Sequence, residues 1–437
     1  MRRALNNIEY ATWIFGQPYN LLAAIRLQGD VDPDRLRIAI DRAQQCHPLL
    51  QATIVEGPGG IPWFDSANVG QIPLLVGEYR SEVDLLDAEK RGNERIYPIF
   101  DLAGHEAPRI AAPGSIPPMA TVELIRADGF CYLICCAQHS IIDGASINIM
   151  LRDILRFYEA PNLDACIDDT MGLEDDLLPE AIRLGLPRDP KGVYRFYHLM
   201  RFFIKIKTRG RPRPARYSDY DDRIFGFFTL ALTKDESDGF FARCKIESVT
   251  VHNAVCTAFS PVFEVINSPV NVRSILARPL EDAIGLLVGG ALITRKYDPK
   301  LSFWENARQY DTKMQVARRP KKIFQFMQLF STVVPPARMR EIHSFIIRNM
   351  ASKRPMAISN FGSIDASGIP YNLDGLQVDR YETYVSQTMD PIVVLLATFQ
   401  GCLQFHVNFI EPMDTRDDME VTVKNALDTI RRAIQEA

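Results

Sequence analysis

The stretch from residue 131 to residue 158 limits the possible folds most, because it joins a buried strand to an amphipathic helix through a short polar loop. Its opening run, CYLICCA, is apolar and follows the turn pair Asp128-Gly129, which predicts a buried strand. From Ile147 to Tyr158 the apolar residues recur at three- and four-residue spacing, which predicts a helix with one buried face. A loop held between two such elements is a frequent place for binding and catalytic side chains.

The loop itself, QHSIIDG, places His139 four residues before Asp143, with Gly144 directly after. Histidine is the natural general base near neutral pH. Asp143 could orient the imidazole as in a catalytic triad, or it could turn away and pair with a basic residue that locks the loop. The sequence has no nucleophile elbow, no P-loop and no dinucleotide-binding glycine motif. Direct attack by a bound acceptor, without a covalent enzyme intermediate, is therefore the simplest scheme.

The composition predicts a packed protein of two large α/β lobes. The chain has 437 residues, of which 47% are hydrophobic and 24% charged. A net charge of only -4 argues against a general affinity for nucleic acid. We expect no signal peptide and no transmembrane helix, because no apolar run is long enough. The eight scattered cysteines are expected to be reduced, buried thiols of a cytosolic protein, and none belongs to a cluster with zinc-ligand spacing.

Strand and helix patterns alternate in both halves of the chain. In the first half we expect strands at 21–27, 49–55 and 121–125, a helix capped by Asp32 and stopped at His47-Pro48, a second helix over 84–100, a surface loop over 103–118 and a linker over 160–190. In the second half we expect strands at 224–232, 271–276, 284–294, 391–398 and 402–409, and helices at 234–245, 250–263 and 417–433. This predicts an N-terminal lobe over 1–185, a basic linker over 186–221 and a C-terminal lobe over 222–437.

Two further histidines are interpreted as structural. His47 precedes a proline at a helix end, and no acid or nucleophile lies nearby in the sequence. His252 falls in the first turn of a predicted helix and is expected to be exposed, with no catalytic partner.

Two stretches are strongly basic. Residues 188–216 hold ten Lys and Arg against one acid, and residues 318–354 hold nine against one, with aromatic and aliphatic residues in between. Charge gathered in this way indicates a surface for anionic lipid, for an acidic protein or for a phosphate-bearing ligand. The alternative is a pair of ordinary helices whose apolar faces pack on the body while their basic faces meet water.

The segment QHSIIDGAS resembles the HHxxxDG motif of the CoA-dependent acyltransferase superfamily. That superfamily includes chloramphenicol acetyltransferases, condensation domains of nonribosomal peptide synthetases, wax ester synthases and polyketide-associated acyltransferases. Further stretches resemble its segments in the same order, so that the resemblance covers nearly the whole chain: CHPLLQATI, NVRSILARP, IGLLVGG and ISNFGSI. It implies two chloramphenicol-acetyltransferase-like lobes, each a mixed β-sheet with flanking helices, and an active-site tunnel at the lobe interface.

The resemblance also implies roles for individual residues. His139 is the general base, and Asp143 is structural, with Arg273 as its salt-bridge partner across the lobe interface. Gly144 leaves room for the substrate tunnel. Gln138 stands where the family usually has its first histidine, a residue that is generally supportive.

A crossover segment completes the implied site. Asn360 and Gly362 belong to the stretch ISNFGSI and are expected to line the tunnel. No metal is implied there.

The resemblance implies acyl transfer from a thioester, on CoA or on a phosphopantetheinyl carrier protein, to a hydroxyl in preference to an amine. The acceptor would be a lipid or a natural product, and no cofactor is bound. The alternatives are a condensation-type enzyme that works only on carrier-bound chains, and a non-catalytic protein that binds an assembly-line partner. We expect a cytoplasmic protein with peripheral membrane contact through 188–216 and 318–354, and no nucleic-acid partner.

Overall fold

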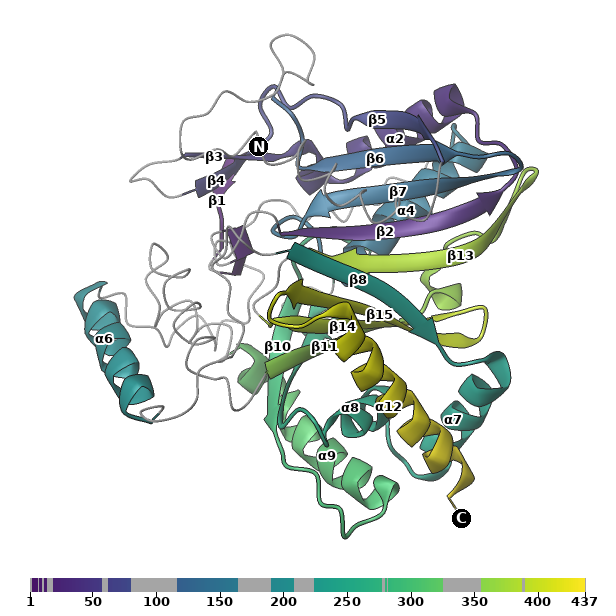
Figure 1. The fold of residues 1–437 in the computed structure, drawn as a ribbon. Coiled ribbons are helices and arrows are strands. Elements are labelled where there is room, and N and C mark those ends of the chain that lie inside the picture. The colour runs from purple at the N-terminus through teal and green to yellow at the C-terminus, as the bar shows by residue number, and fades with distance from the viewer. Residues whose placement is uncertain are drawn as a thin grey trace.

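The computed structural model describes residues 2–6, 8–9, 12–13, 19–56, 62–79, 116–163, 190–207, 224–276, 280, 282–324, 355–386 and 390–436. The helix predicted over 84–100, most of the 160–190 linker and the basic residues 325–354 lie outside the described residues. Two six-stranded sheets lie next to each other, and each has its helices on one side (Figure 1).

The first sheet is mixed and has the order β12-β13-β2-β7-β6-β5. Its antiparallel centre consists of β6 and β7, which flank the predicted turn at Asp128-Gly129, together with β2, and β5 pairs in parallel with β6. The strands span Asn372–Leu373, Leu376–Val385, Asn20–Gln28, Phe130–Gln138, Ala120–Arg126 and Leu74–Glu78, in the order of the sheet. A small separate sheet contains β1 (Arg2–Ala4), β4 (Pro62–Asp65) and β3 (Thr53–Glu56).

Strand β13 shows that the predicted lobe boundaries do not separate the sheets. It lies within the predicted C-terminal lobe of 222–437, yet it pairs with β2 along its length and extends the first sheet. The local sequence pattern does not predict a strand at Leu376–Val385. Its place in the first sheet depends on pairing with β2, which lies over 350 residues earlier in the chain.

The second sheet has the order β10-β9-β11-β14-β15-β8. These strands span Val288–Thr294, Val265–Asn271, Pro355–Ser363, Ile392–Phe399, Cys402–Glu411 and Ile224–Ala231. The strands predicted over 391–398 and 402–409 are confirmed as β14 and β15, which pair as a hairpin; Gln400 and Gly401 in its turn both have positive φ, as a two-residue type I′ turn requires. The strand predicted over 271–276 is wrong, since β9 ends at Asn271 and Arg273–Ile275 forms a 3-10 turn.

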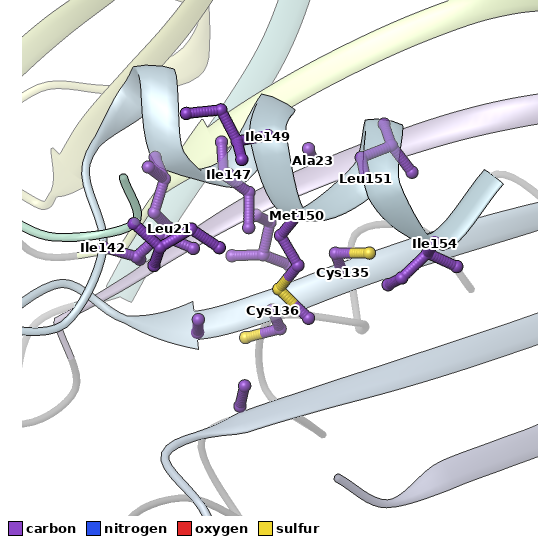
Figure 2. Packing of buried hydrophobic residues seen from close by; sticks show 14 of the residues in the cluster. Leu21, Ala23, Cys135, Cys136, Ile142, Ile147, Ile149, Met150, Leu151 and Ile154 are labelled. Carbon is purple, nitrogen blue, oxygen red and sulfur yellow. The ribbon is translucent and has the colours of Figure 1, made fainter. Parts of the chain in front are cut away.

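Helices α2 (Pro33–Cys46) and α4 (Gly144–Glu159) cover one face of the first sheet. Asp32 caps α2 as predicted, by accepting hydrogen bonds from the next two helical N–H groups. The strand predicted over 49–55 is shorter, because a 3-10 turn at Pro48–Gln51 precedes β3. Figure 2 shows Ile147, Met150 and Ile154 of α4 between the helix and the strands.

Four helices cover the second sheet on the side that lies away from the first sheet (Figure 1). They are α7 (Lys234–Ile246), α8 (Val251–Phe259), α9 (Phe303–Ala317) and α12 (Arg416–Gln435), so the predicted helices 234–245 and 417–433 are confirmed and the one predicted over 250–263 is shorter. The basic helix α6 (Pro190–Lys207) stands apart from both sheets. Among the described helices, none combines the length and the apolar character needed to cross a membrane.

One cysteine departs from the expectation of reduced thiols. Cys46, at the end of α2, is disulfide-bonded. Six described cysteines are free thiols: Cys131, Cys135, Cys136, Cys244, Cys256 and Cys402. Burial raises the pKa of the Cys135 thiol to about 12, so that it stays protonated and acts as a small apolar side chain.

Candidate active site

The loop between β7 and α4 fixes His139 by its backbone and by one ring nitrogen. The backbone N–H donates to the Tyr19 carbonyl at 2.8 Å, and Nδ1 lies 2.7 Å from the Ile142 carbonyl oxygen. Because a carbonyl oxygen only accepts, Nδ1 carries the proton and Nε2 keeps its lone pair. The Tyr19 ring meets the imidazole edge-on, with centroids 4.8 Å apart. The result is an oriented, neutral imidazole whose Nε2 has no hydrogen bond to any described residue.

The environment of His139 favours the neutral form. Burial lowers the pKa of the imidazole, and the Ile142 carbonyl and Asp143 offset this only in part. The residue as a whole is nevertheless only half-buried. A histidine in this state is unprotonated at neutral pH and can accept a proton from a bound group.

Asp143 turns its carboxylate away from His139 and toward the second half of the chain. Arg273 Nη1 and Nη2 donate to its two oxygens at 2.9 Å each, and the Leu287 N–H donates at 2.9 Å. Asp143 also caps α4 by accepting from the Ser146 N–H. The ion pair expected with Arg273 is therefore present, and of the two alternatives for Asp143 the structure has the one that locks the loop.

This ion pair is stable in a buried position because its polar groups are satisfied. Asp143 and Arg273 are only 3% and 4% exposed, so an unpaired charge on either would be costly. Burial by itself would raise the pKa of Asp143, but Arg273 and the hydrogen bonds from Ser146 lower it below its ordinary value.

A second set of contacts ties α4 to residues 282–287. The Ser146 hydroxyl receives hydrogen bonds from Arg273 Nη2 at 2.6 Å and from the Gly285 N–H at 3.0 Å. Two turns further along α4, Arg152 Nη1 donates to Asp282 at 2.6 Å. No local sequence pattern predicts these contacts, since the partners are 127 to 139 residues apart.

The space beside Gly144 is filled by an aromatic ring, where the resemblance implied room for a tunnel. A Cβ atom on Gly144 would clash with the ring of Phe361, which is half-buried on β11. Strand β11 shifts its register between Asn360 and Ser363, and Gly362 has a φ of +75°. The crossover segment thus reaches the loop between β7 and α4, but through Phe361, a residue that the sequence did not single out.

The two predicted tunnel residues flank that ring. Asn360 and Gly362 are both exposed, and the Asn360 side chain accepts from the Gly362 N–H at 2.8 Å. This hydrogen bond shapes the bulge that carries Phe361, and a contact of Asn360 with substrate stays a prediction.

Gln138 is fully buried at the end of β7. Its Oε1 accepts from the Ser140 N–H at 2.5 Å and so closes the first turn of the loop. Gln138 Nε2 and Ser140 Oγ are buried and have no hydrogen-bond partner in the described part of the chain. The loop therefore has unused hydrogen-bonding capacity next to His139.

The two histidines interpreted as structural both have partners. His47 Nε2 lies 2.9 Å from Asp153 Oδ2, although the sequence separates them by 106 residues. The expectation that His252 is exposed and unpartnered is wrong: its Nε2 lies 2.8 Å from Ser268 Oγ, and burial lowers its pKa to about 4. Among the described residues, no group of three or more His, Cys, Asp or Glu could hold a metal ion.

Comparison with known proteins supports the fold at low sequence identity. No family model matches the chain. Surfactin synthase subunit 1 of Bacillus subtilis (strain 168) is 24% identical over 149 residues, which is 33% of this chain and 4% of that protein, so the chain spans a small part of this curated relative.

Solved structures match almost the entire chain. The EpoB NRPS cyclization-docking bidomain from Sorangium cellulosum has a TM-score of 0.67 at 13% identity and covers 100% of this chain and 85% of its own. The TRI3 trichothecene 15-O-acetyltransferase from Fusarium sporotrichioides has a TM-score of 0.66 at 13% identity (99% and 95% covered). Polyketide synthase associated protein 5 from Mycobacterium tuberculosis has a TM-score of 0.64 at 16% identity (99% and 97% covered). The chain has the fold shared by condensation domains and CoA-dependent acyltransferases.

Proposed function

We propose that this chain transfers an acyl group from a thioester to an acceptor hydroxyl, with His139 as general base. The observation that carries the proposal is the state of His139: Nδ1 is bound to the Ile142 carbonyl, and the neutral Nε2 is left available. Fixing the ring at the end of a buried strand holds this nitrogen in one orientation, as general-base catalysis requires.

The proposed reaction balances without a covalent enzyme intermediate. His139 Nε2 takes the hydroxyl proton while the acceptor oxygen attacks the thioester carbonyl carbon. The tetrahedral intermediate collapses, the C–S bond breaks, and the imidazolium returns the proton to the thiolate. An ester and a free thiol are formed. The reaction needs no resident cofactor, because the thioester is already activated.

The intermediate carries an oxyanion, which needs hydrogen-bond donors. Gln138 Nε2 and Ser140 Oγ flank the base in the chain, are buried and have no described partner, and they are our candidates for this role. In the same proposal Asp143 and Arg273 hold the loop in shape and do not touch the substrate.

Donor and acceptor are inferred from the fold relatives. TRI3 is named as an O-acetyltransferase, which supports a hydroxyl acceptor on a natural product or lipid. The EpoB bidomain is named as part of a nonribosomal peptide synthetase, which supports a carrier-protein thioester as donor, with CoA as the alternative. A cytoplasmic location follows from such donors.

The second candidate is a condensation-type enzyme that acts only on carrier-bound chains. The match to surfactin synthase favours it. A non-catalytic, partner-binding role is the third, and the Phe361 ring against Gly144 together with Gln138 in place of a histidine favours it.

A thiol-release screen distinguishes these three candidates. The full chain is incubated with acyl-CoAs or acyl-carrier proteins and with alcohol or amine acceptors, and products are identified by mass spectrometry. We expect ester formation with stoichiometric thiol release. His139→Ala should slow this release at least about a hundredfold, and His198→Ala, on the distant helix α6, should leave it unchanged. Activity on carrier-bound donors alone would support the condensation-type role. No release above the enzyme-free rate from any donor would contradict catalysis.

A further inference from the structure

Helix α6 presents large apolar side chains to solvent. Leu199, Phe202, Phe203 and Ile206 are 51%, 58%, 58% and 54% exposed, and they are four of the twelve exposed large apolar side chains in the described part of the chain. Their spacing of three and four residues places them on one face of the helix. In Figure 1, α6 lies at the edge of the molecule, apart from both sheets.

The exposed face is not the one by which the helix is anchored. Tyr197 is 1% exposed, so its side of α6 is covered. At about 100° per residue, Tyr197 lies roughly opposite the centre of the exposed stripe. Tyr197 is therefore on the buried side of α6, and Phe203 is on the exposed side. The alternative of an ordinary helix, with its apolar face packed and only its basic face toward water, does not fit α6.

The charge of α6 is entirely positive. The helix contains five Lys and Arg and no acidic residue. Arg195 and Lys205 are exposed, and Arg201 is held over the Tyr197 ring, with Nη1 donating to its hydroxyl at 3.2 Å. Exposed aromatic and aliphatic side chains next to cations are the composition of helices that lie in a lipid–water interface.

We propose that α6 is a peripheral membrane anchor, which inserts this apolar stripe among the acyl chains of an anionic bilayer while Arg195 and Lys205 contact the lipid head groups. An acidic protein partner would account for the exposed cations but not for the exposed rings of Phe202 and Phe203. A bilayer accounts for both, because its head groups contact the cations and its acyl chains contact the rings. The proposal does not rest on acyl transfer, because binding to vesicles needs no substrate.

Vesicle co-sedimentation of the full chain tests this proposal. Wild type should bind vesicles of phosphatidylcholine mixed with phosphatidylserine, bind phosphatidylcholine alone much more weakly, and lose affinity as salt is raised. Phe202→Ser with Phe203→Ser should lower the partition coefficient at least about tenfold, given the transfer free energy of two aromatic rings. Arg195→Gln with Lys205→Gln should lower it by about tenfold on anionic vesicles only.

The matched control is Ile246→Ser with Val421→Ser, two side chains on α7 and α12 that are 72% and 60% exposed. This control should bind like wild type, and all variants should keep the wild-type melting temperature. Wild type that does not bind anionic vesicles, or a Phe202/Phe203 variant that binds as well as wild type, would overturn the proposal. If wild type binds no vesicle and the Arg195/Lys205 variant loses activity with an acyl-carrier protein, that pair of results would identify α6 as a protein-docking surface instead.

Discussion

Two histidines in this chain, the half-buried His139 and the buried His47, have opposite relations to an aspartate. His139 and Asp143 are four residues apart, yet the carboxylate turns away to Arg273, and Nε2 of the histidine is left available. His47 and Asp153 are 106 residues apart, yet they are hydrogen-bonded at 2.9 Å. A histidine whose ring is bonded to an aspartate is therefore interpreted as structural, and one whose Nε2 is left available is the candidate base. Distance along the sequence does not distinguish the two.

The structural pair belongs to a chain of contacts between elements. His47 ends α2, Asp153 lies on α4, and Arg152 donates to Asp153 at 2.8 Å as well as to Asp282. Burial by itself would raise the pKa of Asp153, but hydrogen bonds from His47 and Arg152 lower it. This pair joins α2 to α4, whereas the Asp143–Arg273 pair joins α4 to the second half of the chain.

Breaking the Asp143–Arg273 pair should have the largest effect on stability. Arg273→Leu leaves a buried carboxylate without its counter-charge, which costs about 3–5 kcal/mol of unfolding free energy. Urea denaturation measures this cost. Arg416→Leu is the control, because its ion pair with Glu420 is exposed and should contribute less than about 1 kcal/mol. Equal losses of unfolding free energy in the two variants would contradict the structural role of Asp143.

Breaking the His47–Asp153 pair should reduce stability but leave the chemistry intact. His47→Gln removes a buried hydrogen bond, while Arg152 still satisfies Asp153, so we expect a loss of about 1–3 kcal/mol. Turnover per folded molecule should stay near the wild-type value, as measured by thiol release well below the melting temperature. A hundredfold lower turnover in folded His47→Gln would make His47 the catalytic residue.

The contact between Gly144 and Phe361 offers a reversible perturbation of the loop between β7 and α4. Gly144→Ala forces the Phe361 ring aside and should cost about 1–3 kcal/mol through overpacking. Adding Phe361→Leu should recover most of this loss, in a double-mutant cycle of melting temperatures. Additive losses would show that the two residues are not coupled.

The pH dependence of kcat/KM should report the lowered pKa of His139. The base must be unprotonated, so activity falls as pH decreases through its pKa. Because burial lowers that pKa, the acid limb should lie below the ordinary histidine value of about 6.5. A midpoint at or above that value, or an acid limb that persists in His139→Ala, would assign the limb to another group.

The local parts of the fold were predictable, because they depend on neighbours in the chain. The buried strand β7, the apolar face of α4 and the cap at Asp32 follow from periodicity and from hydrogen-bonding capacity. The resemblance, and not the residues alone, indicated Arg273 as the partner of Asp143.

The rest depends on pairings that no local pattern encodes. Strand β13 joins the first sheet across more than 350 residues, and Phe361 meets Gly144 only because a bulge in β11 directs it there. The Asp153 partner of His47 and the contacts of residues 282–287 likewise appear only once the helices and sheets are packed.

The most direct test of this account is single-turnover thiol release by His139→Ala and His47→Gln side by side, with the donor found by screening. General-base catalysis contributes about 10² to 10⁴ in rate, so His139→Ala should be at least about a hundredfold slower while its unfolding free energy changes little. His47→Gln should show the reverse, with lower stability and a rate near wild type. A His139→Ala protein that releases thiol at the wild-type rate would contradict the assignment of the base.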